Sequence, residues 1–216
     1  SFWSRMMERV TGISRREILG YDIFSTLPFL EQVRPQIQGA LKGETSRNEK
    51  CKFQIEQNGR SGNLIVQCGP LANRRGEIEA GAIVVTDITE QIMMQQLNRE
   101  TESRFKNMAN CSPMMLWMSG LDSMCVFFNQ TWLDFTGRKM EEEMGVGWAE
   151  GIHFEDFQRC MDTYIEAFNA RHSFEMEYRL RRHDGEDRWI VDQANPRYTP
   201  DGTFAGFIGS CIDITE

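Results

Sequence analysis

The residues best suited to chemistry in this sequence are three histidines and six cysteines. His153, His172 and His183 lack the i, i+4 spacing that places two imidazoles on one face of a helix. The cysteines, at positions 51, 68, 111, 125, 160 and 211, include no C-x-x-C pair of the kind found in zinc sites. The sequence therefore predicts no metal site and a set of reduced, mostly buried thiols.

A nucleophile needs a base beside it, and Cys160 with His153 is the pair to consider. The two residues are seven positions apart, on either side of the start of an expected helix, and this separation does not align the thiol with the imidazole. No acid is placed to orient His153. Glu141, Glu142 and Glu143 form a charge run typical of a solvated helix face. We therefore expect no catalysis by this segment.

Charge and hydropathy disfavour two classes of partner. The formal net charge is −8, from 24 basic and 32 acidic residues, with no basic run to contact phosphate backbones, so we expect no nucleic-acid partner. The longest apolar stretch, residues 80–85, is far shorter than the roughly 18 residues that cross a bilayer, so we expect no membrane contact by this segment. Reduced thiols in a segment without membrane contact predict a cytoplasmic location. Because the chain begins at Ser1, we expect a piece of a larger protein, whose anchoring is left open.

An internal repeat organises the chain. The tetrapeptide D-I-T-E occurs at residues 87–90 and 213–216, and the pattern T-G-x4-E-x2-G begins at Thr11 and again at Thr136. The two offsets, 126 and 125, agree to one residue and indicate two copies of one unit. Residues 102–126 have no counterpart in the first copy, which is therefore expected to be incomplete at its N-terminus. The predicted division is residues 1–90, a linker helix over residues 91–108, and residues 109–216.

The second copy has the pattern of an α+β domain. Its apolar residues predict a hairpin, a short helix begun by Asn129, a longer amphipathic helix and a three-stranded meander. These elements are expected at residues 114–119 and 124–128, 130–135, 157–168, and 174–180, 188–195 and 204–212. The first copy repeats the meander at residues 51–55, 64–68 and 78–86. The arrangement predicts a five-stranded antiparallel sheet flanked by short helices, incomplete in the first copy.

Three stretches of the second copy carry a resemblance to a known family. They are FFNQTWLDFTGRKMEEEMGVGW, GIHFEDF, and the run from FEMEYRLRRHDGEDRW to GSCIDITE. Their order resembles a PAS domain with its C-terminal PAC segment. The first copy, from TGISRREILGYDI to TDITE, resembles the same family over its last three quarters. The resemblance implies tandem PAS/PAC sensory domains of a bacterial signalling protein of the sensor histidine kinase type.

The link between the copies is expected to be helical, because residues 90–108 contain no Pro or Gly. Its apolar residues, among them Leu97 and Phe105, are compatible with a short coiled coil, so we expect a homodimer through this helix or through a sheet edge. Asp87 and Asp213 are expected to cap a departing helix, with a glutamate at its third position. The predicted signal-relay residues are Asp87, Thr89, Glu90, Asp213, Thr215 and Glu216.

The apolar faces of the second copy converge on one space between sheet and helices. The candidate pocket residues are Trp117, Phe127, Asn129, Trp132, Phe135, Met161, Tyr164, Tyr178, Leu180, Ile190, Gln193 and Cys211. They line a ligand cavity or simply fill a core, and core filling is the favoured interpretation. Capping or strand pairing is likewise favoured for Asn129 and Gln193.

The resemblance allows the cofactors of the family to be compared with this sequence. Haem-binding relatives carry a His on the long helix, but residues 155–170 contain none, and Phe154 follows His153 where relatives often have Pro. A turn or cap is therefore expected for His153. Light-sensing flavin relatives have a reactive Cys in an Asn-Cys-Arg-Phe-Leu type of segment, which is missing here. Haem and covalent flavin photochemistry are disfavoured, and a noncovalent flavin or a small metabolite stays open.

The resulting hypothesis is an input module of a sensor histidine kinase that binds a small ligand or partner and acts on an output domain in the same chain. The alternatives are an input region of a diguanylate cyclase or phosphodiesterase, and a ligand-free dimerisation or spacer module.

Overall fold

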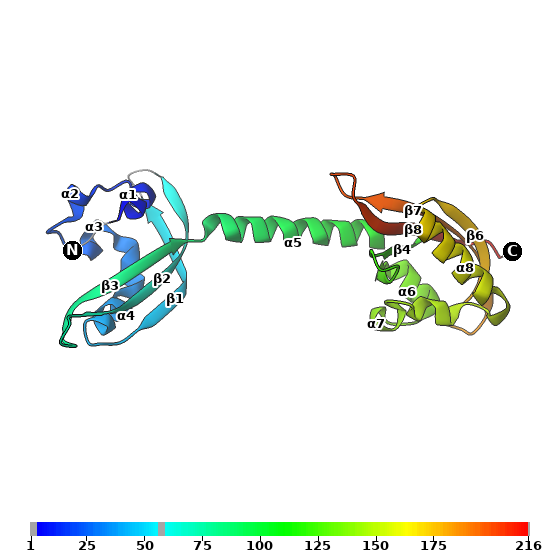
Figure 1. Ribbon diagram of the computed structural model, residues 1–216, viewed down its shortest axis with the longest axis horizontal. Coiled ribbons are helices and arrows are strands. Elements are labelled where there is room, and N and C mark those ends of the chain that lie inside the picture. The colour runs from blue at the N-terminus through cyan, green and yellow to red at the C-terminus, as the bar shows by residue number, and fades with distance from the viewer. Residues whose placement is uncertain (1–3, 56–58, 216) are drawn as a thin grey trace. The chain divides into compact units, whose positions relative to one another are not determined.

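The computed structural model describes residues 4–55 and 59–215 and divides into two compact units, Ser1–Glu100 and Thr101–Glu216 (Figure 1). Each unit consists of an antiparallel sheet and helices that pack on one face of it. The predicted α+β class is confirmed for both. No helix within the described ranges is long and apolar enough to cross a membrane.

The first unit has a three-stranded sheet in the order β1-β2-β3. Its described elements are α1 (Arg5–Thr11), α2 (Arg15–Ile18), α3 (Ile23–Thr26), the 3-10 helix η1 (Pro28–Val33), α4 (Arg34–Ala40), β1 (Ser46–Ile55), β2 (Arg60–Ala72) and β3 (Ile78–Asp87). Alternation puts Cys51, Phe53 and Ile55 of β1 on the buried face, as the sequence predicts. The three strands correspond to the expected meander.

The second unit has a five-stranded antiparallel sheet in the order β5-β4-β8-β7-β6. Its elements are β4 (Met115–Ser119), β5 (Cys125–Phe128), α6 (Gln130–Thr136), α7 (Met140–Glu143), η2 (Gly147–Gly151), α8 (Phe154–Ala170), β6 (Phe174–Arg181), β7 (Asp187–Tyr198) and β8 (Phe204–Asp213). Each predicted strand and helix of this copy is present with similar bounds.

The core of the second unit lies between the sheet and α8, and α8 runs along the sheet in Figure 1. The apolar ladder of α8 buries Cys160, Tyr164 and Ala167, and the alternation of β6 buries Tyr178 and Leu180 on the facing side. The two periodicities therefore meet in one core, which positions the candidate site.

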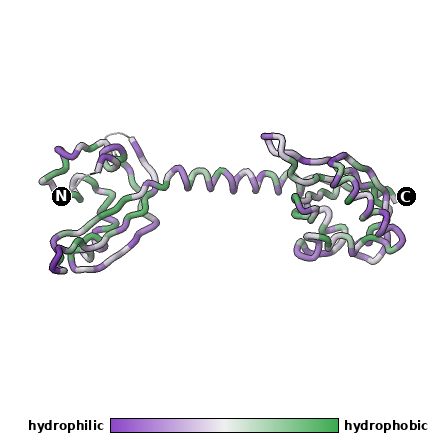
Figure 2. The backbone as a smooth tube through the Cα atoms, in the orientation of Figure 1, coloured by the Kyte–Doolittle hydropathy of each residue, from purple (hydrophilic) through white to green (hydrophobic). Residues whose placement is uncertain are grey.

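A single helix, α5 (Thr89–Asn110), follows the first sheet. Hydrophobic and hydrophilic residues alternate along it in Figure 2. Five large apolar side chains are exposed on it: Met93, Met94, Leu97, Phe105 and Met108. At 100° per residue these five positions fall within about 120° of the helix circumference, so they form one apolar stripe.

Candidate functional site

The core of the second domain encloses a small cavity between the sheet and the helices. Its lining residues are Trp117, Cys125, Phe128, Trp132, Trp148, Tyr164, Phe174, Met176 and Asp192. The free space between them is about 10 Å³, which corresponds to roughly one water molecule. A flavin or haem therefore does not fit unless side chains move.

Three of the candidate pocket residues, Trp117, Trp132 and Tyr164, line this cavity. Tyr178, Leu180, Ile190 and Cys211 are fully buried in the surrounding core, and Phe135 and Met161 pack against that core while partly buried. The residues that sequence reasoning missed are Cys125, Phe128, Trp148, Phe174, Met176 and Asp192. Strand alternation pointed to Phe174 and Met176, whereas Trp148 comes from a short helix with no periodic signal.

Three other candidates lie outside the cavity. Asn129 is buried as the cap of α6, where its Oδ1 accepts from Trp132 N at 3.1 Å and from Leu116 N at 2.9 Å. Gln193 is exposed on the opposite side of β7 and donates to Glu175 of the neighbouring strand. Phe127 packs against a ring of α5, with centroids 5.3 Å from Phe105. Capping and strand pairing, the favoured roles for Asn129 and Gln193, thus account for their contacts.

Asp192 is the polar centre of the cavity. It lies on the inward face of β7 and is 2% exposed. The indole N–H of Trp117 donates to its Oδ1 at 3.0 Å, and the hydroxyl of Tyr178 lies 3.5 Å from its Oδ2. Burial raises the pKa of Asp192 to about 6, an effect that the hydrogen bonds from Trp117, Cys211 and Tyr178 partly offset. The alternation of Ile190, Asp192 and Ala194 along β7 was the sequence signal for this buried acid.

Other buried carboxylates of this domain each have an arginine. Glu143, expected on a solvated face, is 1% exposed, and Arg138 Nε lies 3.4 Å from its Oε1. Asp156 has Arg179 Nε at 2.9 Å from its Oδ2. Within the described part of the chain, no Arg, Lys or His nitrogen lies within 4.0 Å of an oxygen of Asp192. Asp192 is thus a buried acid without a counter-charge.

A glycine positions the indole that bonds Asp192. Gly209 of β8 is the register partner of Trp117. A Cβ atom on Gly209 would lie 2.3 Å from the Trp117 ring. The indole therefore occupies the space beside Gly209 where a side chain would lie, and from there its N–H reaches Asp192 on the next strand.

The thiols around the cavity are not activated. Burial raises the pKa of Cys160 to about 11, and it also raises the pKa values of Cys125 and Cys211. A protonated thiol is a poor nucleophile at neutral pH. His153, the other member of the pair considered from the sequence, caps α8, and its Nδ1 accepts from Glu155 N at 3.3 Å.

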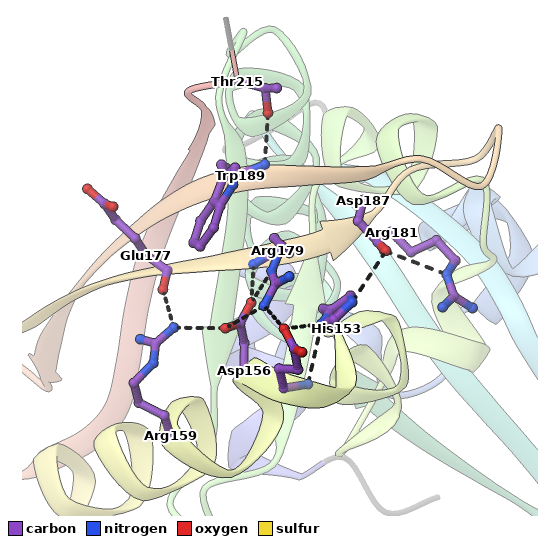
Figure 3. Close-up of polar contacts among 10 residues, drawn as sticks. His153, Asp156, Arg159, Glu177, Arg179, Arg181, Asp187, Trp189 and Thr215 are labelled. Atoms are coloured by element: carbon purple, nitrogen blue, oxygen red, sulfur yellow. Dashed lines mark hydrogen bonds and ion pairs between the residues drawn. The ribbon is translucent and has the colours of Figure 1, made fainter.

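A polar network joins the start of α8 to the sheet (Figure 3). Asp156 accepts hydrogen bonds from the backbone N and the Nε of Arg179, at 3.0 and 2.9 Å, and Arg179 also bonds Glu155 at 2.8 Å. These bonds lower the pKa of Asp156 to about 2. The Arg179 guanidinium carbon lies 5.3 Å from the ring centroid of Trp189 on β7, so the network extends from α8 to that strand.

Trp189 in turn contacts the end of the chain. Its backbone N donates to Thr215 Oγ1 at 2.8 Å, and its carbonyl accepts from Ile214 N at 2.8 Å. Asp213 accepts from Thr215 N at 2.9 Å and from Arg188 Nε at 2.9 Å. These residues hold the segment after β8 against β7.

The first domain repeats this arrangement. Asn63 N donates to Thr89 Oγ1 at 3.0 Å, Asn63 O accepts from Ile88 N at 2.9 Å, and Asp87 accepts from Thr89 N at 3.0 Å. Here the segment leads directly into α5. One detail differs from the expected capping box: Ile88 O accepts the first helical bond, from Ile92 N, so Asp87 lies one residue before the cap. Glu90 is exposed on the first turn of α5, and Glu216 lies outside the described residues.

The chain is similar to several known proteins. Protein y4lL of Sinorhizobium fredii, an uncharacterized protein, is 36% identical over 132 residues, which are 61% of this chain and 16% of that protein. The peroxide stress-activated histidine kinase mak1 of Schizosaccharomyces pombe is 22% identical over 168 residues, 71% of this chain and 10% of the kinase. The chain thus spans at most 16% of these curated relatives.

Among solved structures, the N-terminal domain of a diguanylate cyclase with PAS/PAC sensor from Marinobacter aquaeolei is 20% identical. It covers 47% of this chain and 95% of its own, with a TM-score of 0.43. Residues 1–88 and residues 125–211 each match a family described as the PAS fold. With one match in each of its two units, the chain belongs to the PAS family and consists of two PAS sensory domains in tandem.

Proposed function

We propose that this chain is the ligand-responsive input module of a sensor histidine kinase. The second domain is the sensor, and the segment after β8 passes its state to an output domain that follows in the same chain. The observation that carries the proposal is the repeated exit: both domains bond the D-I-T segment to the middle strand of the meander in the same way, and in the first the segment continues as α5.

The route from the core to the exit runs through β7. Asp192 faces the cavity, and three residues earlier on the same strand Trp189 holds Thr215. A change in the charge or contacts of Asp192 alters the strand to which the exit segment is bonded. The chain therefore has a physical connection between a buried polar centre and its own C-terminal segment.

The choice of a histidine kinase as the full-length protein is supported by the relative from Schizosaccharomyces pombe, which carries that name. A diguanylate cyclase or phosphodiesterase is the alternative output, and the sequence that follows Glu216 distinguishes these outputs from a histidine kinase.

A cytoplasmic location is part of the proposal, on the ground that five of the six cysteines are buried core thiols, which suit a reducing compartment.

The experiment is to replace Asp213 with Ala in the full-length protein and to measure output activity with and without signal. Asp213→Ala removes the carboxylate that bonds Thr215 N and Arg188, so we expect output that no longer responds to signal. Asp201→Ala is the matched control, because Asp201 caps the exposed loop between β7 and β8. Regulation that survives Asp213→Ala would refute the proposed relay.

We further propose that two copies of the chain associate in parallel through the apolar stripe of α5. The stripe exposes 58% of Met94, 62% of Met93 and 76% of Met108, and a second α5 is the surface that matches it residue for residue. In such a dimer the two α5 helices are paired, so a change at the exit of the first domain passes along both helices to the second domains of the two chains.

A further inference from the structure

The charge of Asp192 indicates the chemical class of the ligand. This inference rests on the proposed function, in which the second domain binds a ligand. An ionised carboxylate buried without a counter-charge is unfavourable, and it is relieved either by protonation or by an adjacent cation. The fold gives Arg138 to Glu143 and Arg179 to Asp156 but no cation to Asp192 among the described residues. The place for a positive charge beside Asp192 is therefore left to a ligand.

The aromatic residues that line the cavity also favour a positively charged ligand. Six of its nine lining residues are aromatic: Trp117, Phe128, Trp132, Trp148, Tyr164 and Phe174. Aromatic faces carry partial negative charge and attract cations, most strongly when the site is dry. The ring centroids of Trp148 and Tyr164 lie 5.9 Å apart, and those of Trp117 and Tyr164 lie 5.8 Å apart, so the rings enclose the space from several sides. The carboxylate of Asp192 repels anions from the same space.

The size of the cavity and its oxygen atoms restrict which kind of cation can bind. Metal ions such as Ca²⁺ or Mg²⁺ require several oxygen ligands. The side-chain oxygens of the lining are the carboxylate of Asp192 and the hydroxyl of Tyr164, which donates its hydrogen to Ser123 O at 2.8 Å, and two such groups are too few for either ion. A space of about 10 Å³ matches a group the size of water, which ammonium resembles. A methyl group in addition requires a side chain of the wall to move, and Met176 is the flexible side chain of that wall.

We propose that the core of the second domain binds a small protonated amine, ammonium or methylammonium, with its nitrogen against Asp192 and the aromatic rings around it. The N–H groups of such a cation donate to the carboxylate, and its charge replaces the missing arginine. Because the ligand pairs with the ionised acid, binding strengthens as pH rises through the pKa of Asp192, about 6.

The test is thermal unfolding of this chain, followed by tryptophan emission, in ammonium chloride, methylammonium chloride or sodium chloride of equal ionic strength. A ligand that binds the folded state raises the Tm. We expect both amines to raise the Tm relative to sodium at pH 7.5, methanol to have no effect, and the shift to vanish at pH 4.5, where Asp192 is protonated. Asp192→Asn should abolish the shift at pH 7.5 while the protein stays folded.

Two further variants keep the test decisive. Asp156→Asn removes a buried carboxylate that lies outside the cavity and has an arginine partner, so it should lower the baseline Tm but retain the amine shift. Trp148→Leu removes one aromatic wall without changing charge, and it should reduce the shift. An amine effect that persists in Asp192→Asn, or no amine effect at pH 7.5, overturns the inference.

The outcome is separable from that of the proposed function. If amines have no effect but Asp213→Ala still uncouples the full-length protein, the relay stands and the ligand class is wrong. If amines bind at Asp192 but Asp213→Ala leaves regulation intact, the site stands and the relay is wrong.

Discussion

Asp192 and Asp156 are buried carboxyl groups whose pKa values move in opposite directions. The pKa of Asp192 rises from an ordinary value of 3.8 to about 6 through burial, and that of Asp156 falls to about 2 through its bonds to Arg179. A raised carboxyl pKa means that the folded state holds the proton more tightly than the unfolded state. Asp192 therefore contributes stability below pH 4 that is lost as pH rises to 6, and Asp156 contributes stability above pH 4 that is lost as pH falls to 2.

Replacing Asp192 with Asn should stabilise the second domain at pH 7 to 8. The buried charge costs up to about 3 kcal/mol above pH 6, from two pKa units at about 1.4 kcal/mol each. The amide retains an oxygen for the indole N–H of Trp117. Urea unfolding between pH 4 and pH 8 checks this, because four of the five tryptophans lie in the second domain and report its unfolding. A variant whose stability falls between pH 4 and 6 as steeply as that of the wild type would contradict the assignment.

Replacing Asp156 with Asn should have the opposite effect. The variant loses the ion pair that bonds the start of α8 to β6. We expect a loss of about 2 kcal/mol in the free energy of unfolding at pH 7, in line with the depressed pKa of Asp156. The same urea titration measures it, and Asp162→Asn, an exposed position on α8, is the control. Equal stability of the two variants would show that the network of Figure 3 does not hold α8 to the sheet.

At the scale of elements, β7 links the core to the exit segment through backbone bonds. Thr215→Val keeps the shape of the side chain and removes the oxygen that accepts from Trp189 N. We expect the amide hydrogen of Trp189 to exchange faster in this variant, because it loses its acceptor, at a cost of about 1 kcal/mol. Hydrogen exchange measured by NMR checks this. Thr89→Val should do the same to the amide of Asn63 in the first domain, and protection that is unchanged at both positions would contradict the proposed equivalence of the two exits.

The elements themselves could be predicted from the sequence, because periodicity determines them locally. The ladder of α8 and the alternation of β6 assigned both elements correctly, and the alternation also gave the buried face of β6. Two residues of the α8 ladder, Phe157 and Ile165, are exposed in the structure, against the prediction. The candidate site was predicted less well, because it depends on registry between distant strands. Asp192 was missed although it alternates with Ile190, since an acid on a strand is ordinarily assigned to the solvent face. Glu143 was misassigned because nothing in a run of three glutamates shows which of them turns inward, as Glu143 does beside Arg138.

At the scale of the whole molecule, the apolar stripe of α5 determines the expected association state. Leu97→Glu places a charge in the stripe and should shift the protein from dimer to monomer. Gln95→Glu adds the same charge on the opposite side of the helix and should leave the dimer intact. Native mass spectrometry at several protein concentrations distinguishes the two. A monomeric wild-type chain, or a dimer that is indifferent to Leu97→Glu, would exclude association through α5.

Gly209 has a consequence for engineering this module. Because the Trp117 ring occupies the place of a side chain there, one added methyl group would push the indole away and separate its N–H from Asp192. Gly209→Ala thus displaces the indole permanently, without any added compound. In the full-length protein, we expect such a chain to be fixed in one output level, a constitutive mutant obtained by changing a residue that has no side chain of its own.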